Sequence, residues 1–182
     1  MFEQFKTRAE GVSAEVHRFA TNAEALDFLV KFLRAEDVAD QPGQYGVFAD
    51  CPFLAAVDWR QLEAVAGLWF EVTRERAAGA KVGISQMDWA LADTGTLVQD
   101  ATAIDKRLVS TLPTIHVALI ATSGLRPDMP AWLGDARPDS AGYLAMITGP
   151  SRTADIERVL TIGVHGPERL VIVFVDQLGG TN

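Results

Sequence analysis

Two uninterrupted apolar runs constrain the fold of this 182-residue chain more than any other feature. One includes Val117 to Ala121, inside the segment Pro113 to Thr122, and the other spans Leu170 to Val175. Neither run alternates polar with apolar residues, so both faces of each strand must be covered, as in parallel sheets. Helical segments separate these strands, which predicts an α/β fold with a largely parallel sheet flanked by helices. Further strands are expected at Val12–Phe19, Tyr45–Ala49, Leu68–Val72, Val82–Ser85 and Tyr143–Thr148.

Local signals predict several helices between the strands. Thr21 and Glu24 form a capping box ahead of a segment with leucines and a valine on one helical face. The other helices expected are one capped by Asp58 over Trp59–Ala66, a brief helical turn from Ser85 through Leu91, and one around Pro130–Leu133 within the loop at 123–141.

Size and charge bound the class of protein. With 48% hydrophobic residues and no visible repeat or linker, the chain is expected to form a single domain over residues 1–182. The formal net charge of −8 and the lack of a dense basic cluster argue against nucleic acid as a partner. The first eight residues do not resemble a signal peptide, and no uncharged run is long enough to span a bilayer. We therefore expect a cytoplasmic protein with no membrane span.

Cysteine and histidine spacing give no sign of a bound metal or cofactor. Cys51 is the single cysteine, too few for a disulfide, an iron–sulfur cluster or a cysteine-rich zinc site, and we interpret it as a small buried filler. No His-x-x-x-His pair, Gly-x-Gly-x-x-Gly fingerprint or Walker loop is present. The sequence therefore predicts no metal, iron, flavin or dinucleotide cofactor.

The stretch from Thr148 to Glu157 has the pattern of a strand that turns into a helix. Ser151 or Thr153 could cap that helix, which is expected to end near Gly163, and the free amides of its first turn would face an anion beside Arg152. The alternative is that this segment only makes a tight turn and caps a helix. The predicted anion-binding residues here are Gly149, Pro150, Ser151, Arg152, Thr153 and Asp155.

A second polar loop is predicted at Asp93, Thr94, Gly95 and Thr96. It resembles the Asp-Thr-Gly loop of aspartic proteases, but those enzymes are nearly all β, whereas strands and capped helices alternate in this chain. The remaining alternatives are a simple turn and a ligand-facing loop whose glycine lets a ligand approach closely. We expect this loop to lie within one pocket's width of the 149–153 loop, at the carboxyl ends of the strands.

Two histidines are candidates for the same site. His116 stands at the entry of an apolar strand, and His165 lies in a Gly-Val-His-Gly-Pro turn together with Gly166. A structural histidine with satisfied hydrogen bonds is the alternative for each. Replacement of Arg152 or His165 by alanine is expected to impair ligand binding more than stability, because both flank turns.

Four segments together resemble one family. They are Ala-Asp-Thr-Gly-Thr-Leu-Val at 92–98, Leu-Pro-Thr-Ile-His at 112–116, Gly-Pro-Ser-Arg-Thr-Ala-Asp-Ile-Glu at 149–157 and Gly-Val-His-Gly-Pro at 163–167. In this order they are similar to the LUD-domain family, in its lactate-utilisation protein C branch, with the resemblance concentrated in residues 82–175. The resemblance implies a NagB/RpiA/CoA-transferase-like fold related to that of 5-formyltetrahydrofolate cyclo-ligase.

The resemblance also implies a function in oxidising L-lactate to pyruvate beside two partners, lactate-utilisation proteins A and B, of which the first is rich in cysteine and the second is an iron–sulfur protein. The first hypothesis is a non-redox component or accessory protein that binds a small anionic ligand and does not oxidise lactate alone. The second is a stand-alone enzyme of acyl or phosphate-ligand chemistry, with Asp93 or His165 as acid or base. The third is a structural assembly module. The resemblance carries no catalytic residue across to this chain.

Overall fold

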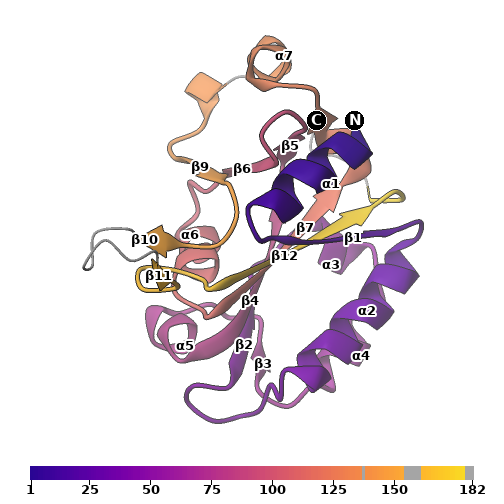
Figure 1. Ribbon diagram of the computed structural model, residues 1–182. Coiled ribbons are helices and arrows are strands. Elements are labelled where there is room, and N and C mark those ends of the chain that lie inside the picture. Colours follow the sequence, from indigo (N-terminus) through magenta and orange to yellow (C-terminus); the bar gives the residue numbers. More distant parts are fainter. Residues whose placement is uncertain (137, 154–160, 179–182) are drawn as a thin grey trace.

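The core of the protein is a six-stranded sheet in which every neighbouring pair is parallel (Figure 1). The computed structural model describes residues 1–136, 138–153 and 161–178. The strand order β1-β12-β7-β4-β2-β3 alternates with helices along the chain, so the predicted α/β class is confirmed. The strands of this sheet are β1 (Glu15–Phe19), β2 (Tyr45–Phe48), β3 (Leu68–Trp69), β4 (Ala80–Met87), β7 (Ile115–Ala121) and β12 (Arg169–Val175).

One face of the sheet is covered by α2 (Asn22–Ala35), with α3 (Pro52–Ala55) and α4 (Arg60–Glu63) beside it. The predicted capping box at the start of α2 is present, because Thr21 accepts from the Glu24 amide and the Glu24 carboxylate accepts from the Thr21 amide. Cys51 is buried on this face, as expected, and burial raises the pKa of its thiol to about 11. The α2 residues buried in this core are Ala25, Leu26, Leu29, Val30 and Leu33.

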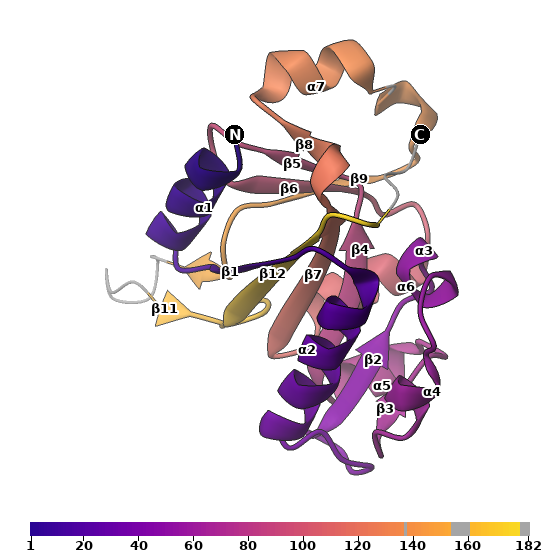
Figure 2. The same cartoon turned by 90° about the vertical axis from the view of Figure 1, so that its right-hand side faces the viewer.

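The other face carries α1 (Phe2–Gly11) and a second, four-stranded sheet (Figure 2). Phe5 and Ala9 of α1 are fully buried in a cluster with side chains of β7 and β12. The second sheet has the order β8-β5-β6-β9, and α7 (Met129–Asp135) packs Trp132 edge-on against Trp89 of this sheet. Its strands are β5 (Trp89–Leu91), β6 (Thr96–Asp100), β8 (Leu125–Arg126) and β9 (Leu144–Ile147).

Two further helices, α5 (Arg74–Ala78) and α6 (Ile104–Thr111), lie on the same side as the second sheet. The end of α6 comes unusually close to β4 at Gly83, where a built Cβ would lie 2.4 Å from the Val109 carbonyl oxygen. Gly83 is paired with His116 in the β4–β7 register. Because glycine has no side chain at position 83, the end of α6 can lie next to the start of β7.

The structure corrects several expected elements. The segment from Ser85 through Leu91 is extended, in β4 and β5, because its polar residues find partners inside the fold; Gln86 Oε1, for example, accepts from the Phe53 amide. The helix over Trp59–Ala66 is shorter, with Trp59 and not Asp58 at its start. The strand expected at Leu68–Val72 is only two residues long. The helices α1, α3, α5 and α6 were not expected.

The segment after the 149–151 turn differs in part from the expectation. Arg152–Thr153 form β10, which pairs in antiparallel orientation with β11 (Thr161–Ile162), so Ser151 does not cap a helix. Residues 154–160, including Asp155, lie outside the described part of the chain. The helix expected there, which Thr153 could cap, falls on these residues. In the described part, no helix is both long and apolar enough to cross a bilayer.

Candidate functional site

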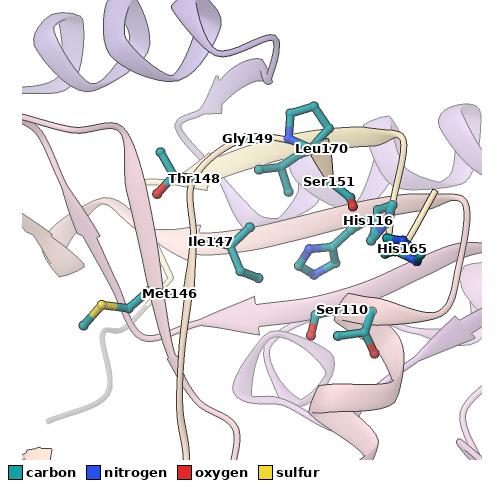
Figure 3. Close-up of a pocket in the computed structure, with 13 residues that line it drawn as sticks. Ser110, His116, Met146, Ile147, Thr148, Gly149, Ser151, His165 and Leu170 are labelled. Atoms are coloured by element: carbon teal, nitrogen blue, oxygen red, sulfur yellow. The ribbon is translucent and has the colours of Figure 1, made fainter. Parts of the chain in front are cut away.

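A pocket of about 220 Å³ opens at the amino ends of β7 and β12 (Figure 3). The last turn of α6, strand β9 and the loop after β9 form its other walls. Residues from four separate segments thus meet around one small space. The lining residues are Ser110, Thr111, His116, Met146, Ile147, Thr148, Gly149, Pro150, Ser151, His165, Gly166, Pro167 and Leu170.

Backbone hydrogen bonds hold two of the lining segments together. The Ser151 amide donates to the Pro167 carbonyl at 2.8 Å, and the Gly163 amide donates to the Ser151 carbonyl at 3.0 Å. Gly166 lies close to Ser151, since a built Cβ on Gly166 would be 3.1 Å from the Ser151 Cβ. The Ser151 amide is therefore not free for an anion, which corrects the expectation that it belongs to an open helix start.

His116 is the most buried polar group of the pocket. It is the second residue of β7 and only 1% exposed. Its Nε2 lies 2.9 Å from the Ser85 Oγ, whereas its Nδ1 has no hydrogen-bond partner in the described part of the chain. Burial lowers the pKa of this imidazole from 6.5 to about 4, so the ring is neutral at physiological pH. Figure 3 shows Ile147 pointing toward this ring and Met146 pointing away from it.

The rest of the pocket offers neutral polar groups. Ser110 and Thr111 both donate their hydroxyl hydrogens to the Arg107 carbonyl, which leaves their oxygens as acceptors. His165 is exposed and also lines the pocket, next to the end of α6. No Asp, Glu, Lys or Arg is among the described lining residues, and no cluster of three potential metal-binding residues occurs in the described ranges. The arrangement suits a small molecule that is recognised by hydrogen bonds.

The structure places Arg152 outside this pocket. Its guanidinium donates to the Val12 carbonyl and, at 3.1 Å, to the Ser13 Oγ, just after the end of α1. Thr153 is half-buried in β10. The arginine therefore ties the 149–153 segment to α1 rather than standing free as a clamp.

The 93–96 turn also lies outside the pocket, although it touches the pocket wall. Thr96 is buried, and its Oγ1 lies 2.8 Å from the Thr148 Oγ1. Asp93 and Thr94 are exposed. Gly95 has φ +71°, and a built Cβ would lie 2.6 Å from the Ala9 amide nitrogen. The space beside this glycine is therefore filled by helix α1 and not by a ligand.

The two predicted loops are thus adjacent, but not where they were expected. The pocket lies at the amino ends of β7 and β12, because the second sheet folds back over the face of the first and carries residue 148 to that end. Sequence reasoning did not find Ser110, Thr111 or Ile147, which become neighbours of His116 only through the fold. The predicted contacts that do line the pocket are His116, Gly149, Pro150, Ser151, His165 and Gly166.

The LUD domain profile matches residues 2–175, nearly the whole chain. The chain belongs to the LUD-domain family. A lactate utilization protein C from Exiguobacterium is 40% identical over 114 residues, covering 59% of this chain and 50% of that protein. The Bacillus subtilis protein of the same name is 36% identical over 107 residues, covering 56% of this chain and 45% of the relative. These similarities confirm the resemblance to the lactate-utilisation protein C branch.

The chain differs in length from its curated relatives and shares its fold with a solved structure. A lactate utilization protein C from Oceanobacillus iheyensis is 32% identical over 130 residues, covering 68% of this LUD-domain chain and 54% of that protein. The chain thus spans about half the length of the curated relatives it matches. A crystal structure of a DUF162 family protein from Deinococcus radiodurans superposes with a TM-score of 0.60 at 16% identity, covering 96% of this chain and 95% of that one, and so shares the fold.

Proposed function

We propose that this LUD-domain protein is a ligand-binding, non-redox component of an L-lactate utilisation system, and that its pocket takes a small 2-hydroxy or 2-oxo carboxylate. One observation carries the proposal. Three of the four segments that resemble the family, through His116, Gly149–Ser151 and His165–Pro167, line a single pocket. The fourth contacts the wall through the bond between Thr96 and Thr148. The names of the relatives supply the context of lactate utilisation.

The chemistry of the pocket supports this class of ligand. A volume of about 220 Å³ suits a molecule with few heavy atoms. The imidazoles of His116 and His165 can donate to carboxylate oxygens, while the hydroxyl oxygens of Ser110 and Thr111 can accept from a ligand hydroxyl. A 2-hydroxy acid presents both an acceptor and a donor. The donors and the acceptors of the pocket match these two groups.

The proposed partners are lactate-utilisation proteins A and B, the cysteine-rich and the iron–sulfur component of such a system. With one cysteine, which is buried, this chain has too few ligands for an iron–sulfur cluster, so electrons would pass through the partners. Its contribution would be to bind the substrate or product beside them. Purified alone, the protein is expected to bind L-lactate or pyruvate without oxidising lactate.

A charge series at His165 tests the proposal. The side chain is exposed, so His165→Lys, His165→Gln and His165→Glu should all fold. We expect calorimetric affinity for L-lactate and pyruvate to fall in the order Lys, Gln, Glu, by about 3- to 10-fold per step, because a positive charge at the pocket attracts the carboxylate and a negative one repels it.

Growth on L-lactate of a host that lacks the native gene should follow the same order. Lys31→Glu, in a pocket on the opposite face of the sheet, is the matched control and should change neither affinity nor growth. Affinity that does not respond to the charge at position 165 would contradict this location of the site. Oxidation of lactate by the isolated protein with an artificial electron acceptor would contradict the non-redox role.

A further inference from the structure

The Nδ1 atom of His116 is a buried polar atom that the fold leaves without a partner among the described residues. A buried donor or acceptor without a hydrogen-bond partner destabilises the folded state, so native proteins rarely keep one without a functional reason. The other ring nitrogen is occupied by Ser85, which is fully buried and does not line the pocket. The Nδ1 edge is therefore the part of the ring that is left for a molecule in the pocket.

The contacts of Ser85 decide which ring nitrogen carries the hydrogen. Its hydroxyl has one hydrogen and two acceptors in reach, the His116 Nε2 at 2.9 Å and the Met87 Sδ at 4.0 Å. A thioether sulfur is a weak acceptor compared with an imidazole nitrogen. The Ser85 hydroxyl therefore donates to Nε2, and the single hydrogen of the neutral ring must lie on Nδ1.

We infer that His116 presents an Nδ1–H donor to the buried end of the pocket ligand, and that Ser85 is the positioning residue that selects this tautomer. The inference rests on the proposed function. It adds that the buried end of the ligand must carry an acceptor, a carboxylate or carbonyl oxygen, since a donor there would meet a donor. L-lactate and pyruvate meet this requirement. In protonated 1-amino-2-propanol, a positively charged aminomethyl group replaces the lactate carboxylate, so this compound should bind at least about tenfold more weakly.

The tautomer can be read directly in the free protein. The chain has three histidines, so the ring nitrogens of a ¹⁵N-labelled sample can be assigned in long-range ¹⁵N–¹H spectra with His17→Gln and His165→Gln variants. We expect the Nδ1–H form for His116 at neutral pH, and a change in its Nδ1 signal when L-lactate is added. The Nε2–H form would overturn the inference.

Two variants separate positioning from folding. Ser85→Ala should abolish the preference for the Nδ1–H form and weaken L-lactate binding. The double variant Ser85→Ala/His116→Phe removes both partners of the buried bond and keeps a ring of similar size, so it should fold while binding L-lactate roughly 10- to 100-fold more weakly. Unchanged binding by the double variant would overturn the inference alone. A wild-type protein that binds none of these probes would instead contradict the proposed function, and the inference with it.

Discussion

Replacement of Gly149 by alanine is expected to lower the free energy of unfolding by about 2–5 kcal/mol, measured by urea titration. Two effects add at this residue. Its φ of +76° is costly for any residue with a side chain, and a built Cβ would lie 2.7 Å from the carbonyl oxygen of Val12, just after α1. That oxygen also accepts from Arg152, so the end of α1 has little freedom to move away.

Gly11, inside α1, provides the matched control. Its φ lies outside the left-handed region and a built Cβ would meet nothing within 4 Å, so Gly11→Ala should leave stability unchanged or raise it by up to about 1 kcal/mol. If Gly149→Ala unfolded with the same free energy as Gly11→Ala, the close approach of α1 to the 149–153 segment would be refuted.

The second large effect is a loss of stability in acid that His116 causes. Burial lowers the pKa of this imidazole from 6.5 to about 4, so the unfolded chain takes up a proton more readily than the folded one. The contribution of His116 is therefore fully present above pH 6.5 and is lost as the pH falls from 6.5 to 4. A pKa lowered from 6.5 to about 4 corresponds to a loss of about 3 kcal/mol of unfolding free energy at pH 4.

The contribution of the His116 imidazole can be measured as the slope of unfolding free energy against pH between pH 6.5 and 4. The Ser85→Ala/His116→Phe variant should show a much flatter slope between pH 6.5 and 4 than the wild type. The pKa of His17 is also lowered by partial burial, so His17→Gln shows how much of the slope belongs to that residue. A double variant with the wild-type slope would mean that His116 does not stay neutral in the folded protein.

The parts of the fold that the sequence predicts correctly depend on local signals. The apolar side chains of β7 and β12 must be buried on both faces of each strand. The capping box of Thr21 provides hydrogen-bond partners for the backbone amides at the start of α2 without help from distant residues. The extended conformation of Ser85 to Leu91 could not be predicted in this way, because polar residues there are accommodated by partners from distant segments, His116 and Phe53 among them.

The same distinction applies to the candidate site. The sequence predicts a ligand close to Gly95, whereas the structure places the Ala9 amide of α1 there. Gly149 likewise faces Val12, just after α1. Arg152 looks like a free cation in the sequence, yet it is bound at the end of α1, so Arg152→Ala should cost stability as well. The pairing of Ser85 with His116 depends on the register between β4 and β7, which no local pattern encodes.

A crystal structure of the protein grown with L-lactate or pyruvate tests the central claim most directly. We expect a carboxylate oxygen within hydrogen-bond distance of the His116 Nδ1, with Ser151 and His165 around the ligand and the Ser85–His116 bond intact. Ligand bound elsewhere, with the pocket at the amino ends of β7 and β12 left empty, would contradict it.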